Sequence, residues 1–218
     1  MIEARGARVL SSDRGMDHMQ GKRGLSIMLD GADANLAEQR STRGERPVSE
    51  EIVNVGVAEY FVTHNPHMLA SFGLGSCVGV ALYDDKKKIG GLAHIMLPDS
   101  QSMSKKGNPG KFADTAIGSM VEEMERLGSK RSDIKARIAG GACMFTIPGA
   151  VNPRNVPGPC LGMQIGERNI EATRAVLKEL KIQLVAEDIG GSYGRTMRFN
   201  ISDGKVTISS IKHGAREL

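Results

Sequence analysis

Apolar residues recur with regular spacing only beyond residue 51, where strand-like runs alternate with two helix-like stripes. Runs bounded by glycines and polar turns predict a strand with a glycine break at 52–62. They also predict strands at 78–83, 90–98, 134–139, 182–188, 196–201 and 205–211, the last expected strand. Residues 68–71 are expected to lead into the strand at 78–83. Helical spacing predicts helices over 111–128 and 169–180, the second with Asn169 as a candidate N-cap. This mixed order of elements favours the α+β class.

The first part of the chain differs in composition from the rest. Residues 1–48 mix Arg, Asp, Gly, Ser and Gln with few apolar residues. Such a segment buries too little apolar surface to offset the entropy lost on ordering. We therefore expect a disordered N-terminal tail at 1–48 and one domain at 49–218, with a loop at the proline-rich segment 147–162.

The charges are mild and dispersed. The net charge is +4, from 29 basic and 25 acidic residues among 218. No block of Lys and Arg is typical of a nucleic-acid or membrane-surface footprint. No apolar run reaches the roughly 18 residues of a membrane span, and the start of the chain lacks the apolar region of a signal peptide. These features predict a cytoplasmic protein with no nucleic-acid partner and no membrane insertion.

One cysteine and one histidine lie on consecutive strand-like runs. Cys77 follows a glycine-rich stretch and opens one run, and His94 interrupts the next run. A polar turn at 84–88 separates the two runs, so we expect them to be adjacent strands. A thiol beside an imidazole is the minimum for nucleophilic acyl chemistry, in which the sulfur attacks a carbonyl and the imidazole takes and returns the proton.

Simpler explanations exist for each of these residues. A cysteine in an apolar run is usually a small buried hydrophobe, and a histidine there is often a satisfied core side chain. A zinc site made of Cys77, His94 and Cys143 is a further alternative, although no paired ligand spacing supports it. The glycine pairs at 140–141 and 190–191 do not fit a phosphate-binding motif, so tight turns or close backbone contacts near the site are favoured.

Six segments together resemble one known family. They are Leu74–Val80, Gly91–Pro98, Lys111–Asp114, Ile138–Ala142, Ile165–Asn169 and Glu187–Gly191. In order and without large gaps, they resemble CheD, the chemoreceptor glutamine deamidases of bacterial and archaeal chemotaxis, over residues 52–211. The resemblance implies an α+β fold of packed mixed β-sheets with helices on the outer faces, similar to the catalytic domain of deamidating toxins.

The resemblance also implies a set of site residues. The family's catalytic cysteine, histidine and preceding hydroxyl residue fall on Cys77, His94 and Ser71. The better-known members carry Thr in place of Ser71, and Ser keeps the hydroxyl. Backbone N–H groups around Gly75 and Ser76 are candidate donors to an oxyanion. No cofactor and no metal are expected.

The implied activity is cysteine-dependent hydrolysis of glutamine side-chain amides on the cytoplasmic helices of chemoreceptors. This protein-glutamine glutaminase reaction yields glutamate and ammonia, and methylesterase action on the same positions is a further expectation. The resemblance implies a CheC-type phosphatase as a regulatory partner. We expect Cys77 and His94 to form a thiolate–imidazolium pair. A non-catalytic adaptor that binds receptors or CheC and a small-molecule amidase are the alternatives.

Overall fold

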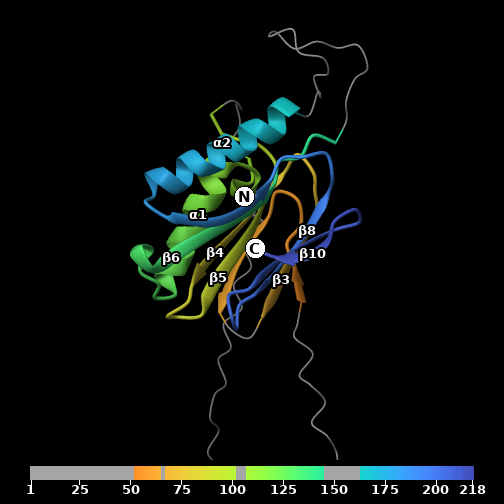
Figure 1. Cartoon of the computed structure of the whole chain (residues 1–218). Coiled ribbons are helices and arrows are strands. Elements are labelled where there is room, and N and C mark those ends of the chain that lie inside the picture. Colours follow the sequence, from red (N-terminus) through yellow and green to blue (C-terminus); the bar gives the residue numbers. More distant parts are fainter. Residues whose placement is uncertain (1–51, 65–66, 102–106, 145–162) are drawn as a thin grey trace, which may run out of the picture. The chain divides into compact units, whose positions relative to one another are not determined.

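The strands build two five-stranded sheets that share one apolar layer (Figure 1). The computed structural model describes residues 52–64, 67–101, 107–144 and 163–218, which all belong to one compact unit. The expected tail at 1–48 and the expected loop at 147–162 lie outside the described residues. In the described part, neither α-helix has the length and apolar character needed to cross a bilayer.

Each sheet has a mixed strand order. The first sheet runs β1 (Ile52–Asn54), β3 (Met68–Leu74), β8 (Arg195–Asn200), β9 (Val206–Ser210) and β10 (Gly214–Glu217). The second runs β2 (Tyr60–His64), β5 (Ile89–Ile95), β4 (Val78–Asp84), β6 (Ile134–Gly140) and β7 (Gln183–Ile189). The pairs β1–β3 and β6–β7 are parallel, and the other pairs are antiparallel. Among the described strands the chain changes sheet four times, and one of these crossings lies between β3 and β4.

The layer between the sheets is filled by alternate residues from both. Successive strand residues point to opposite faces, so one face of each strand supplies this layer. Its buried members include Leu69, Leu74, Ala81, Tyr83, Leu92, Met197, Phe199, Val206 and Ile208. Tyr83 and Phe199 meet edge to face with ring centroids 5.6 Å apart, and the Tyr83 hydroxyl donates to the Ile201 carbonyl at 3.0 Å. These contacts hold β4 of the second sheet against β8 of the first.

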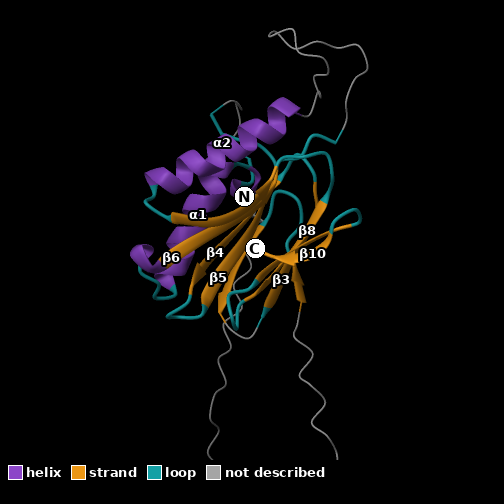
Figure 2. Ribbon diagram, viewed as in Figure 1, coloured by secondary structure: helices purple, strands orange, loops and turns teal. Residues whose placement is uncertain are grey.

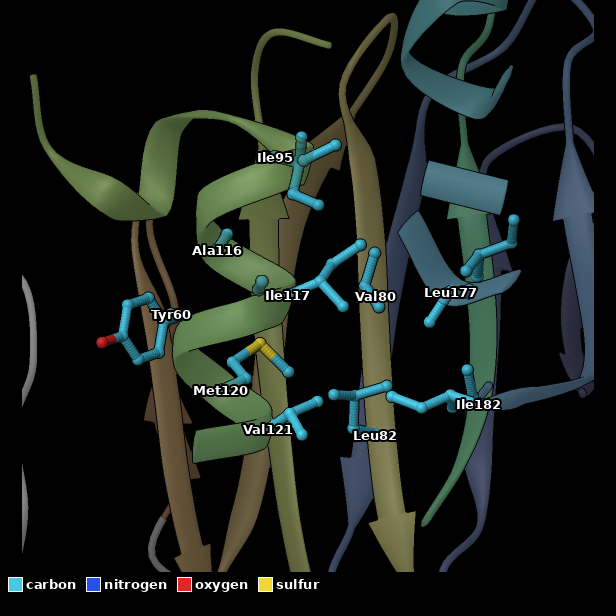
Figure 3. Packing of buried hydrophobic residues seen from close by; sticks show 14 of the residues in the cluster. Tyr60, Val80, Leu82, Ile95, Ala116, Ile117, Met120, Val121, Leu177 and Ile182 are labelled. Carbon is cyan, nitrogen blue, oxygen red and sulfur yellow. The ribbon is translucent and has the colours of Figure 1, made fainter. Parts of the chain in front are cut away.

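Two α-helices cover the other face of the second sheet. They are α1 (Ala113–Arg126) and α2 (Met163–Glu179), and the short 3-10 helices are η1 (Pro109–Lys111) and η2 (Arg131–Asp133). Figure 2 shows both α-helices on one side of β4, β5 and β6, with β3 and β8 on the other side. Val80 and Leu82 pack there against Ile117, Met120 and Leu177 (Figure 3).

The expected α+β class with packed mixed sheets is confirmed, with corrections in detail. In the described part the α-helices lie on one outer face rather than on both. The strand predicted at 52–62 with a glycine break is two separate strands, because the connection that holds Gly56 and Ala58, the latter at φ +63°, divides it into β1 and β2 of different sheets. Residues 68–71 belong to a strand of their own, β3, and β10 follows the strand that was expected to be the last.

We predict that Leu82→Ala destabilises the protein by about 2–5 kcal/mol, because it leaves a cavity in a packed core. Leu82 is 0 % exposed and lies between the second sheet and the α-helices. Urea denaturation measures the change. The matched control is Ile211→Ala, at a fully exposed position, where a change within about 0.5 kcal/mol is expected. Equal stability of the two variants would contradict this core assignment.

Candidate active site

Cys77 lies on the connection that carries the chain from the first sheet to the second. β3 ends at Leu74 and β4 begins at Val78, so residues 75–77 make the crossing. The Cys77 thiol is free and half-buried. Its side chain packs against the apolar layer between the sheets. The sulfur therefore stands at the border between the interior and the surface.

His94 lies on the strand next to Cys77, as the sequence predicted. β4 and β5 pair antiparallel, with Gly79 directly opposite His94 and Val78 opposite Ile95. Cys77 and Gly79 share one face of this strand pair, so Cys77 and His94 are diagonal neighbours, typically about 7–8 Å apart at Cα. Glycine at position 79 puts no side chain between them. The imidazole is buried, with 1 % of His94 exposed.

Ser71 reaches His94 from the opposite sheet. The Ser71 Oγ lies 2.8 Å from His94 Nδ1 and donates to the Val55 carbonyl at 3.1 Å. A β-bulge follows: Ser71 pairs with Met197 and Leu74 with Arg195, so β3 uses one residue more than β8. The bulge is accommodated by Gly73 at φ +71°. It buries Ser71 while the next residue, Phe72, is exposed.

This network fixes the position of the proton on the His94 ring. A hydroxyl has one proton, and the Val55 carbonyl can only accept, so Ser71 gives its proton to Val55. Ser71 Oγ then accepts from Nδ1–H of His94. The lone pair therefore resides on Nε2, which is buried and has no hydrogen-bond partner among the described residues. The ring is prepared to act as a base through Nε2.

Burial acts on both titrating groups. It raises the pKa of the Cys77 thiol above its ordinary value of 9.0, and a hydrogen bond from the residue's own backbone N–H offsets part of this. Burial also lowers the pKa of His94 below its ordinary value of 6.5. Both shifts favour a neutral thiol beside a neutral imidazole. Neither shift favours the thiolate–imidazolium pair expected from the sequence, and that pair stays a prediction for the alkylation experiment below to test.

The glycine pairs at 140–141 and 190–191 lie in the backbone that packs beside Cys77. Gly140 adopts φ +118°, and a Cβ there would lie 2.2 Å from the Cys77 carbonyl oxygen. The Gly190 N–H donates to the Gly140 carbonyl at 2.8 Å. The glycines at 140–141 thus allow close backbone contact near the site, and those at 190–191 adopt positive φ values of +71° and +72° that suit a tight turn, as the sequence indicated.

The alternative zinc site is not formed. Among the residues that the structure describes, no three His, Cys, Asp or Glu side chains are grouped so as to hold a metal ion. Cys77, His94 and Cys143 all belong to that part of the chain.

Sequence reasoning missed two contributors to the site. The Val55 carbonyl fixes Ser71 through the backbone, which leaves no mark in side-chain composition. Asn169 is not an N-cap, because α2 begins at Met163. Its side chain instead donates to the carbonyls of Ser76 and Met96 at 2.9 and 3.0 Å. The only signal was an asparagine at a helical position that faces the core.

Fold and site together define an α+β protein in which an imidazole and a hydroxyl are hydrogen-bonded where two sheets meet. A half-buried thiol lies at the start of the neighbouring strand. The family model described as CheD chemotactic sensory transduction matches residues 96–210. The "Probable chemoreceptor glutamine deamidase CheD" of Clostridium botulinum (strain Hall) is 50% identical over 166 residues, 76% of this chain and 97% of the relative. The Clostridium acetobutylicum protein of the same name is 45% identical, with 76% and 95% covered. The chain belongs to the CheD family.

Solved structures also show some likeness. The crystal structure of YlmD from Geobacillus stearothermophilus matches with a TM-score of 0.39 at 16% identity, over 60% of this chain and 50% of that chain. Bacillus licheniformis hypothetical protein YfiH matches with a TM-score of 0.37 at 20% identity, over 59% of this chain. This chain spans about half the length of YfiH, with 49% covered.

We predict that Ser71→Ala reduces the share of the His94 tautomer protonated at Nδ1, because it removes the acceptor that holds this proton. Ser71→Thr keeps the hydroxyl and is expected to keep the tautomer. The ¹⁵N chemical shifts of the imidazole nitrogens, measured by NMR at a pH where the ring is neutral, report the two forms. Identical shifts in wild type and Ser71→Ala would show that Ser71 does not select the tautomer.

We also predict that alkylation of Cys77 by iodoacetamide accelerates with rising pH to a midpoint above 9.0, because burial raises the thiol pKa. The rate is followed by mass spectrometry of the peptide that contains Cys77. His94→Gln should not move the midpoint upward, since no imidazolium stabilises the thiolate at rest. A wild-type midpoint below the ordinary thiol value that rises in His94→Gln would instead indicate an ion pair.

Proposed function

We propose that this protein hydrolyses the side-chain amide of glutamines on chemoreceptors, with Cys77 as nucleophile, His94 as acid and base, and Ser71 as the orienting group. The observation that carries the proposal is the Ser71–His94 hydrogen bond between the sheets. It leaves Nε2 unprotonated on the face of the strand pair to which the half-buried Cys77 thiol also belongs. Membership of the CheD family and the names of the clostridial relatives supply the substrate class.

The first half-reaction forms a thioester. Cys77 Sγ attacks the amide carbon while its proton passes to His94 Nε2, and the carbonyl electron pair moves onto oxygen. Because burial disfavours the charged forms of both groups, the proton moves as the sulfur attacks rather than beforehand. The oxyanion then collapses, the C–N bond breaks, and ammonia leaves with the proton that His94 held.

The second half-reaction restores the enzyme. His94 Nε2 takes a proton from water as the water oxygen attacks the thioester carbon. The C–S bond breaks, Cys77 regains the proton, and the product is a glutamate side chain. Backbone N–H groups of the crossing connection at Gly75, Ser76 and Cys77 are the proposed oxyanion donors, and removing one such donor typically costs about 10²–10³-fold in turnover.

The proposal also includes the reaction class, cellular place, side activity and regulatory partner that the family resemblance implies. The reaction is that of a protein-glutamine glutaminase, it takes place in the cytoplasm on receptor helices, and it requires no cofactor. Methylesterase action on the same receptor positions uses the same thioester, with methanol in place of ammonia as leaving group. A CheC-type phosphatase is the proposed regulatory partner.

We predict that Cys77→Ala and His94→Gln each abolish conversion of a cognate receptor fragment, because each removes a group that the thioester path requires. Intact-mass analysis measures the conversion, since each converted site changes by the difference between an amide NH₂ and an acid OH. His213→Gln is the matched control, because His213 is an exposed imidazole outside the candidate site. It should retain full activity.

Unchanged conversion by Cys77→Ala would rule out the nucleophile. A wild-type protein that binds the receptor fragment without changing its mass would favour the non-catalytic adaptor. Release of ammonia from free glutamine, without any action on the receptor fragment, would favour the small-molecule amidase.

A further inference from the structure

In the connection that carries Cys77, three successive backbone carbonyls each accept a hydrogen bond. The Gly75 oxygen accepts from Ala142 N–H at 2.7 Å and the Cys77 oxygen from Gly141 N–H at 2.8 Å. Between them, the Ser76 oxygen accepts from the Asn169 side chain at 2.9 Å. Three successive peptide carbonyls are thus fixed, two by backbone and one by a side chain.

Fixing these carbonyls also fixes the N–H groups. In a trans peptide the C=O of one residue and the N–H of the next point in opposite directions. The N–H of Ser76 therefore points away from Ala142, and the N–H of Cys77 points away from Asn169. Among the described residues, neither N–H donates to a backbone acceptor. The Cys77 N–H lies beside its own Sγ, where it partly offsets the rise in the thiol pKa.

Asn169 reaches this connection because α2 approaches the backbone very closely. A Cβ on Gly166 would lie 2.6 Å from the Gly141 carbonyl oxygen, and a Cβ on Gly141 would lie 2.4 Å from Ile170 Cδ1. Only glycine at both positions allows this approach. Asn169 follows Gly166 by three residues, which places it on the same face of the helix. It is 0 % exposed.

The orientation of the Asn169 amide follows from its partners. Nδ2 donates to the carbonyls of Ser76 and Met96, and a flipped amide would set Oδ1 against two carbonyl oxygens. Both amide protons are therefore used. Ser76 precedes Cys77, and Met96 lies two residues after His94. One side chain thus joins the backbone beside the thiol to the backbone beside the imidazole.

We propose that Asn169 is a positioning residue: by holding the Ser76 carbonyl on the helix side, it keeps the Cys77 N–H directed at the oxyanion. The part of this inference that concerns the receptor substrate rests on the function proposed above. The Ser76–Cys77 peptide is the one link of the connection without a backbone anchor, and it follows Gly75, whose backbone turns easily. Without Asn169 this peptide can rotate, and a donor that must first be reoriented stabilises the transition state less.

The test uses Asn169→Leu, which keeps the approximate shape and removes both donors, and Asn169→Ala as a second variant. With a receptor fragment, kcat is expected to fall by about 10²–10³-fold with KM unchanged, the loss typical of one oxyanion donor. Acylation of Cys77 by p-nitrophenyl acetate passes through an oxyanion and should fall by a similar factor. Alkylation by iodoacetamide displaces iodide without forming an oxyanion, so its rate should match that of wild type.

The split between acylation and alkylation separates positioning from a merely structural role. If acylation and alkylation fall together, Asn169 only supports the fold around the thiol, and the proposal is overturned. It is equally overturned if neither rate falls. Circular dichroism and urea denaturation establish that each measured variant is folded.

A matched control comes from the same helix. Thr173 lies four residues after Asn169, is 0 % exposed, and its Oγ1 has no hydrogen-bond partner among the described residues. Thr173→Val keeps its shape and touches neither the Ser76 nor the Met96 carbonyl. All three rates should remain at wild-type values. A fall in acylation alone in this variant would show that any change in α2 has the effect, and would contradict a specific role of Asn169.

The receptor-independent assay also keeps the two proposals apart. A wild-type protein that leaves the receptor fragment unchanged, while Asn169→Leu still loses acylation and keeps alkylation, would sink the proposed function and leave this inference standing. Receptor conversion by wild type with equal acylation rates in wild type and Asn169→Leu would do the reverse.

Discussion

The hydrogen bond between Ser71 and His94 is the interaction on which the site depends. It is a polar contact between two sheets that otherwise meet mainly through apolar side chains, because Ser71 comes from one sheet and His94 from the other. The Val55 carbonyl completes it by taking the serine proton. An orienting group on the same strand as the imidazole would need no tertiary structure, whereas this one exists only when both sheets are packed.

The rest of the site follows from the way the chain crosses between the sheets. The crossing presents Cys77 at the border of the interior, and the backbone of residues 140–142 holds it from one side. The glycines there are required by contact distance, since a side chain on Gly140 would strike the Cys77 carbonyl. Burial raises the pKa of the Cys77 thiol and lowers the pKa of His94, so it disfavours the charged form of each group.

The sequence was informative where a residue's role depends on its own strand. The alternating apolar pattern predicted β4 and β5 and their hairpin, and it therefore placed Cys77 next to His94. The sequence indicated a glycine break between β1 and β2 but not their membership of different sheets, because that depends on pairing with β3 and β5 elsewhere in the chain. It also missed the role of Asn169, because the acceptors of its amide are backbone atoms from two distant segments. Roles that consist of backbone contacts become visible only in three dimensions.

Met197 illustrates a wider consequence of building a site across two layers. It pairs with Ser71 on the first sheet, and its sulfur would lie 2.9 Å from a Cβ on Gly79, the residue opposite His94. Leu74 Cδ1 would lie even closer to that Cβ, at 2.8 Å, so the side chains of Leu74 and Met197 together fill the space that glycine leaves opposite His94. Substitutions at positions 74, 79 and 197 are therefore coupled through volume, although none of the three residues carries a polar side chain.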